Sequence, residues 1–228
     1  MSTSRSRRPG LTRTRIVSTA IDLADESGLG VVSMRRLATE LDVTPMALYN
    51  HVGHREELID AMVDRSLSEI GTVGQADWRE AVRARILAAR AVVGRHPWLP
   101  AAIETRRAAP ASALAHLDAV CGHLSDGGLD PDRVHYAMHA LGTRLWGFTR
   151  EVLPAPELPE DPGERDAALR QHSERYPRLV AMVASVAATG HTCDPEVEFG
   201  YALDLLLDGL AATPPPPRGE ACPSRAPS

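Results

Sequence analysis

The sequence predicts an all-α protein of 228 residues, with a small N-terminal helix-turn-helix domain and a larger helical domain behind it. Aromatic residues make up only 4% of the chain, so the core must be built from Ala, Leu and Val. A β-sandwich would instead require short alternating runs richer in Thr, Tyr and Ile. Pro, Gly and cap residues divide the apolar stretches into helices. The first apolar stripe has helical spacing: Ile16, Ala20, Leu23 and Ala24.

The stretch 37–52, L-A-T-E-L-D-V-T-P-M-A-L-Y-N-H-V, predicts two short helices joined by a tight turn. The second begins at Thr44 and Pro45, because a hydroxyl caps free N–H groups and proline has no N–H to leave unpaired. Its outward side chains can donate, accept or stack, which suits a helix in the major groove of DNA. They are Thr44, Met46, Tyr49, Asn50 and His51. The alternative is a small helical hairpin with a polar outer face.

Helix-capping residues and Gly or Pro breaks predict where the other helices begin and end. The first helix starts near Thr12 and stops at Gly28, Ser33 caps the second, and the fourth spans about 54–70. Further helices are predicted at 77–94, 98–104, 110–127, 130–153, 164–175, 177–189 and 195–212. We expect a basic disordered arm at 1–10, a helix-turn-helix domain at 11–71, a second domain at 72–212 and a disordered Pro-rich tail at 213–228.

Charge is unevenly distributed along the chain. Residues 1–58 carry a net charge of +1, with five arginines in the first fifteen residues, whereas residues 59–228 carry −6. A site-specific DNA binder can work this way, because the arm meets phosphates while the acidic body stays clear of the duplex. Three cysteines without C-x-x-C spacing indicate a reducing cytoplasm, and no apolar run reaches the ~18–20 residues that a membrane span requires.

The predicted helix at 195–212 is apolar nearly all round, through Phe199, Tyr201, Ala202, Leu203, Leu205, Leu206, Leu207 and Leu210. Such a helix is buried on both sides. We therefore expect a homodimer in which helices near 131–153 and 195–212 of two subunits form a four-helix bundle. The alternative is a central core helix in a monomer.

The chain resembles the tetracycline-repressor family of bacterial regulators. The residues that carry the resemblance are I-V-S-T-A-I-D-L-A-D-E-S-G-L (16–29), V-S-M-R-R-L-A-T-E-L-D-V (32–43) and L-Y-N-H-V-G-H-R-E-E-L-I-D-A-M (48–62). D-W-R-E and R-H-P-W-L, between 77 and 99, are similar to the C-terminal domain of the tetracycline-repressor type. The family usually has Gly where this chain has Asp42, which predicts a positive φ there.

The resemblance implies a set of DNA contacts. Pro45, Met46, Ala47, Tyr49, Asn50 and His51 match the recognition helix. Asn50 can pair bidentately with adenine. The remaining contacts are Ser33 and Arg35 at the start of the second helix, Thr44, and Arg55 as a phosphate clamp at the head of the fourth. For Tyr49 the alternative is core packing, and Arg36 is read as a solvated charge.

The family senses small molecules in its second domain. Candidate pocket residues are Trp98, His135, Met138, His139, Arg144, Trp146 and Met182. His135 and His139 lie at i and i+4, a spacing that can hold a metal ion. No third ligand is identifiable, and such a pair is more often ordinary interior or interface structure. The two tryptophans are equally consistent with core packing. We expect no required cofactor, only an effector with or without a metal ion.

Two other classes of function fit the sequence less well. Catalysis is disfavoured because the chain lacks a Gly-rich phosphate loop, a G-x-S-x-G elbow and paired carboxylates. An all-α scaffold without sequence-specific DNA binding would not need the arginine arm or the L-Y-N-H-V helix. The resemblance implies a ligand-responsive regulator of the repressor kind, with two recognition helices ~34–36 Å apart on a palindromic operator. Ligand binding would shift the fourth helix and change that spacing.

Overall fold

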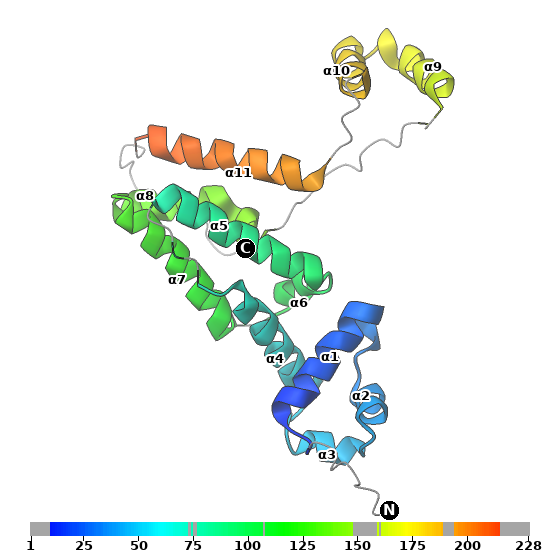
Figure 1. Cartoon of the computed structure of the whole chain (residues 1–228), viewed down its shortest axis with the longest axis vertical. Helices are drawn as coiled ribbons and strands as arrows, with labels where there is room; N and C mark the ends of the chain where they lie inside the picture. The colour runs from blue at the N-terminus through cyan, green and yellow to red at the C-terminus, as the bar shows by residue number, and fades with distance from the viewer. Residues whose placement is uncertain are drawn as a thin grey trace, which may run out of the picture. The chain divides into compact units, whose positions relative to one another are not determined.

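The computed structural model describes residues 10–72, 74, 77–106, 108–147, 159, 161–188 and 194–214. The described residues form helices, turns and loops, so the all-α fold predicted from the sequence is confirmed (Figure 1). By its internal contacts the chain divides into two compact units: residues 1–148 with 203–228, and residues 149–202. Within the described residues, no helix is both long and apolar enough to cross a membrane.

The first unit begins with the helix-turn-helix. Its elements are α1 (Arg13–Ser27), η1 (Leu29–Val31), α2 (Met34–Leu41), α3 (Pro45–Tyr49), α4 (Arg55–Leu67) and η2 (Ser68–Ile70). The cap residues decide where these helices begin, as the sequence predicts. Thr12, Ser33 and Thr44 each accept a hydrogen bond from a backbone N–H three residues further on. Each cap satisfies one N–H that the first helical turn leaves without a partner.

A continuous apolar core joins α1, α2, α3 and α4. Each of the four helices contributes one or two fully buried side chains: Ile16, Leu37, Leu48, Leu58 and Met62. Leu-to-Ala changes in such a core cost about 2–5 kcal/mol, because the lost contacts leave a cavity. Leu48 is the one residue of α3 that is buried in this core. The opposite side of this short helix faces solvent.

The rest of the first unit consists of α5 (Trp78–Arg95), α6 (Leu99–Glu104), α7 (Ala111–Asp126), α8 (Pro131–Leu141), η3 (Gly142–Trp146) and the end of α11 (Pro195–Ala212). The prediction that the eighth helix runs to Leu153 is wrong. The α-helix ends at Leu141, where Gly142 takes φ +44° and its N–H caps the carbonyl of Met138. Residues 148–158 lie outside the described part of the chain.

The second unit holds α9 (Pro162–Ser173) and α10 (Pro177–Ala188), divided before Pro177 as predicted. Asp161 caps α9 by accepting from the Glu164 N–H. The first turn of α9 therefore starts two residues earlier than the sequence prediction. On α10 one apolar stripe faces solvent: Leu179, Met182 and Val186 are all exposed.

Helix α11 is the long C-terminal helix, and it carries two apolar stripes. Phe199, Leu203 and Leu207 are buried, while Val197, Tyr201 and Leu205 are 56–67% exposed. Its second half is held to α5 by ion pairs from Arg79 and Arg83 to Asp204, and from Arg79 to Asp208. One stripe thus packs inside the chain, and the other has no cover in the described residues.

Candidate nucleic-acid interface and effector domain

The outer side of α3 is the candidate nucleic-acid interface. Leu48 is fully buried, whereas Met46 is 71% and Tyr49 is 46% exposed. Asn50 and His51 are exposed as well, in the C-cap and the turn after α3. The exposure of Tyr49 rules out core packing, its alternative explanation. A short helix thus presents a thioether, a phenol, an amide and an imidazole together, groups that can contact base edges and phosphates.

The turn between α2 and α3 takes the conformation that the sequence predicts. Asp42 has φ +56° and ψ +48°, the left-handed region, and it is the one non-glycine residue with positive φ among those described. Its N–H donates to the carbonyls of Ala38 and Thr39, which closes the end of α2. Aspartate tolerates this region better than most residues, so the turn forms without glycine.

The starts of α2 and α3 carry three of the predicted contact residues: the caps Ser33 and Thr44, and Arg35 in the first turn of α2. The Ser33 hydroxyl accepts from Arg36 N–H at 3.2 Å, and the Thr44 hydroxyl accepts from Ala47 N–H at 3.3 Å. Each hydroxyl keeps its hydrogen to donate to an acceptor such as a phosphate oxygen. Arg35 is exposed, and the neighbouring Arg36 pairs with Glu40 at 3.3 Å on the surface of α2.

Arg55 has a structural role that the sequence did not suggest. Its Nε donates to the carbonyl of Val32 at 2.9 Å, and its Nη2 donates to that of Leu29 at 3.3 Å. The half-buried guanidinium therefore holds the η1 loop, between α1 and α2, against the start of α4. Its predicted role as a phosphate clamp stays a prediction.

Helix α4 connects this interface to the larger helical part of the first unit. Arg106, after α6, donates to Asp60 at 2.7 Å, and Ser112 of α7 donates from its N–H and its hydroxyl to Asp64 at 3.0 and 2.8 Å. Two carboxylates on consecutive turns of α4 are thus held by α6 and α7. A displacement of α6 or α7 would pull directly on α4, which supports the predicted route for the signal.

The predicted effector residues fall into separate groups. Trp98 is buried and its indole N–H donates to Asp25 at 2.6 Å, which places it at a contact with α1. Arg144 and Trp146 lie on η3. Met138 is half-buried on α8, and Met182 is exposed on α10 of the second unit. The role of each in ligand binding stays a prediction.

The two predicted metal-spaced histidines face outward. His135 and His139 are exposed on α8, and their rings meet edge to face with centroids 4.6 Å apart. Among the described residues, no group of three or more His, Cys, Asp or Glu side chains has a metal-binding arrangement. Tyr136, 47% exposed, lies beside them on the same helix. The surface of α8 therefore fits the alternative interpretation of the pair as interface residues.

His116 is a buried polar residue that the sequence interpretation missed. It is fully buried on α7, and its Nε2 donates to the carbonyl of Leu145. Burial lowers the pKa of His116 to about 4. The hydrogen bond to Leu145 acts to raise this pKa, and the positive charge of Arg85 lowers it further. The ring of His116 lies 5.1 Å from that of Trp146. The signal was present, because Ala113, His116, Val120 and Leu124 form one helical stripe.

Comparisons with known proteins identify the family. A family model described as "Tetracyclin repressor-like, C-terminal domain" matches residues 71–213. The chain is 31% identical to the HTH-type transcriptional repressor DrrR1 of Streptomyces coeruleorubidus, over 96% of this chain and 84% of that protein. The chain belongs to the tetracycline-repressor family. It is a helix-turn-helix transcriptional regulator.

Two further relatives support this assignment. The chain is 30% identical to the tetracycline repressor protein class A from transposon 1721 of Escherichia coli, over 86% of this chain and 88% of that protein. The crystal structure of ActR from Streptomyces coelicolor in complex with actinorhodin matches with a TM-score of 0.65 and 26% identity, over 90% of this chain and 98% of that one. A scaffold without DNA binding is not favoured, because the proteins to which this chain is similar are named an HTH-type transcriptional repressor and a tetracycline repressor.

Proposed function

We propose that this regulator is a homodimeric repressor that occupies a palindromic operator and leaves it when a small-molecule effector binds its second domain. The outward face of α3 and its C-terminal turn carry the proposal. Met46 and Tyr49 are exposed on a helix that one buried leucine fixes in place, and Asn50 and His51 are exposed directly after it. The repressor would act in the cytoplasm and would need no cofactor beyond the effector.

The uncovered stripe of α11 supports the dimer. Val197, Tyr201 and Leu205 follow one another at i, i+4 and i+8, so they form one exposed apolar line. Helix α8 adds exposed Tyr136 and is tied to α11 where Arg133 donates to the carbonyl of Leu210 at 2.7 Å. A two-fold axis through these helices would place two recognition helices on one face, as a palindromic site requires.

The relatives support effector-controlled release. DrrR1 is named a repressor, and ActR has been crystallised with the small molecule actinorhodin. In the present chain, Asp60 of α4 accepts from Arg106, which follows α6, and Asp64 of α4 accepts from Ser112 of α7. An effector that moves α6 or α7 would shift α4, separate the two recognition helices and lower operator affinity.

Substitutions on α3 test the proposed recognition. We expect Tyr49→Ala and Asn50→Ala each to abolish specific binding to the DNA upstream of the protein's own gene, measured by gel shift, while sedimentation shows an intact dimer. Tyr176→Ala is the matched control, because Tyr176 is 47% exposed and Tyr49 is 46% exposed. Normal operator binding by either α3 variant would show that the register of the recognition helix is wrong.

A further inference from the structure

The exposed side of α8 carries three aromatic rings that lie against one another. His135 and Tyr136 meet edge to face with ring centroids 5.6 Å apart, and His135 and His139 meet in the same way at 4.6 Å. The opposite side of the helix packs inside the chain through Ala137 and Leu141, which are both buried. Two imidazoles one helical turn apart are therefore displayed on the outer side of a helix whose inner side is anchored.

The spacing of His135 and His139 suits a metal ion. Histidines at i and i+4 lie on one face of a helix, so their ring nitrogens can bind the same ion. Imidazole is a ligand that suits zinc, copper and nickel, and a structural zinc site takes four ligands in a tetrahedron. In the part of the chain that the structure describes, no group of three or more His, Cys, Asp or Glu side chains could hold a metal ion. One chain therefore supplies two of the four ligands.

A second copy of the chain is the occupant that this side of α8 fits. Arg133 of α8 donates to the carbonyls of Leu210 and Thr213 at 2.7 and 3.2 Å, so α8 lies against the C-terminal end of α11. Within the same unit, Tyr136 of α8 is 47% exposed and Leu205 of α11 is 56% exposed. The outer side of α8 thus continues the uncovered stripe of the helix proposed to form the dimer. In a two-fold interface, a residue beside the axis meets its own copy.

We infer that His135 and His139 of the two subunits together form a divalent transition-metal site on the two-fold axis of the dimer. Four imidazole nitrogens match the tetrahedral coordination of Zn²⁺, an ion that has no electronic preference for another geometry. The inference rests on the dimer of the proposed function and goes beyond it, because no metal takes part in operator or effector binding there. The ion strengthens a dimer that also forms without it, since a ligand held by two subunits favours their association.

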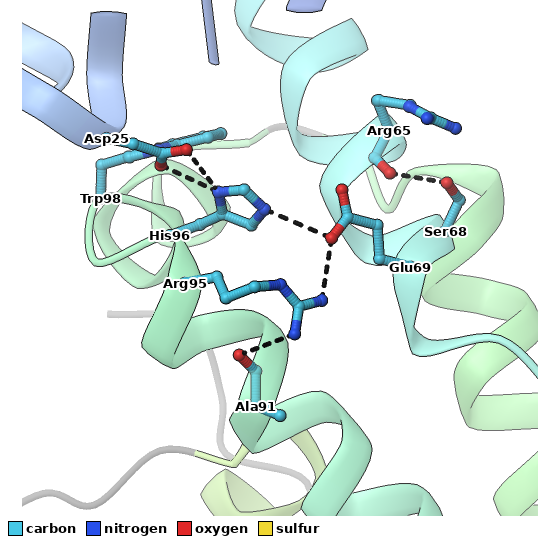
Figure 2. A network of polar contacts seen from close by, with 8 residues as sticks. All are labelled: Asp25, Arg65, Ser68, Glu69, Ala91, Arg95, His96 and Trp98. Atoms are coloured by element: carbon cyan, nitrogen blue, oxygen red, sulfur yellow. Dashed lines mark hydrogen bonds and ion pairs between the residues drawn. The ribbon is translucent and has the colours of Figure 1, made fainter. Parts of the chain in front are cut away.

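The sequence contains one pair of histidines four residues apart, and it is the pair on α8. Other histidines differ from this pair in burial or in their neighbours. His96, between α5 and α6, is buried, and its Nδ1 is hydrogen-bonded to Asp25, as Figure 2 shows. His172 is exposed on α9 beside Tyr176, with ring centroids 6.4 Å apart. It is the matched control, because it is an exposed histidine next to an aromatic ring with no second histidine one turn away.

Metal uptake by the untagged, full-length protein tests the site. Equilibrium dialysis against micromolar Zn²⁺ should give one bound ion per two chains, and Co²⁺ in its place should show the visible absorption of a four-coordinate site. His135→Ala and His139→Ala should each abolish this uptake, whereas His172→Ala should leave it unchanged. All three side chains are exposed, so circular dichroism should show the same helical fold in each variant. One ion per chain, no uptake by the wild type, or full uptake by His135→Ala would overturn the inference.

Fluorescence-detected sedimentation over a series of protein dilutions tests whether the ion joins two subunits. With free Zn²⁺ at about tenfold its dissociation constant, the dimer dissociation constant should fall about tenfold relative to protein in a chelator, because the ion binds only the dimer. His135→Ala should lose this shift and His172→Ala should keep it. An operator-binding dimer that dissociates equally with Zn²⁺ and with chelator would overturn this inference alone. A protein that stays monomeric in both would overturn the proposed dimer as well.

Discussion

The protonation of His116 should make stability depend on acidity. In the unfolded chain a histidine takes up its proton near pH 6.5, but burial, aided by Arg85, holds the folded-state pKa at about 4. Between these values the unfolded state binds more protons, so stability is full above pH 6.5 and declines as pH falls toward 4. At about 1.36 kcal/mol per pH unit the full loss is about 3 kcal/mol, of which about 2.5 kcal/mol should appear by pH 4.5.

Urea unfolding of the wild type and of His116→Gln, at one fixed protein concentration between pH 4.5 and 7.5, measures this contribution. The glutamine keeps an N–H near the Leu145 carbonyl but cannot titrate. We expect the free energy of unfolding of the wild type to fall more steeply with acidity than that of the variant, by about 2.5 kcal/mol at pH 4.5. His116→Phe, which also cannot titrate, should share the flatter slope at a different absolute stability. Parallel slopes for all three proteins would refute the reasoning.

Three further predictions follow from exposed and strained positions. Arg35→Ala should reduce the slope of log affinity against log salt by about 0.9 if Arg35 contacts one phosphate, whereas Arg36→Ala should leave it unchanged; salt titrations of operator binding distinguish them. Leu205→Glu should dissociate the dimer in sedimentation, while Leu114→Glu, at the same 56% exposure on α7, should not. Gly147→Ala should cost about 2 kcal/mol or more in urea unfolding, because φ is +69° and a Cβ would lie 2.3 Å from the backbone of α5; an unchanged midpoint would count against that geometry.

Most of the fold was predictable because its helix ends are set by local chemistry. Thr12, Ser33, Thr44 and Asp130 cap helices where the sequence places them, and Asp42 takes the predicted positive φ. The eighth helix was predicted too long because its apolar pattern continues past Gly142. The backbone nevertheless turns there to a positive φ, which ends the helix.

The exposed side of α3 was predictable for the same local reason, but the contacts between distant residues were not. Arg55 holds two carbonyls more than twenty residues away, and Asp25 meets His96 across 71 residues. No spacing in the sequence links those pairs, because the first contact depends on the packing of the η1 loop against α4 and the second on the packing of α1 against the α5–α6 corner. For Trp98 the residue type suggested either a pocket wall or the core, and it could not indicate that the indole N–H donates to Asp25 of α1.

Operator binding by the purified protein is the most direct test of the role assigned to α3. Its affinity for the DNA upstream of its own gene should be compared with that for an unrelated duplex at two salt concentrations. We expect tight binding to the upstream DNA alone, weakening as salt rises because phosphate contacts release counterions. Equal and weak binding to both duplexes would contradict specific recognition of that DNA by the exposed face of α3.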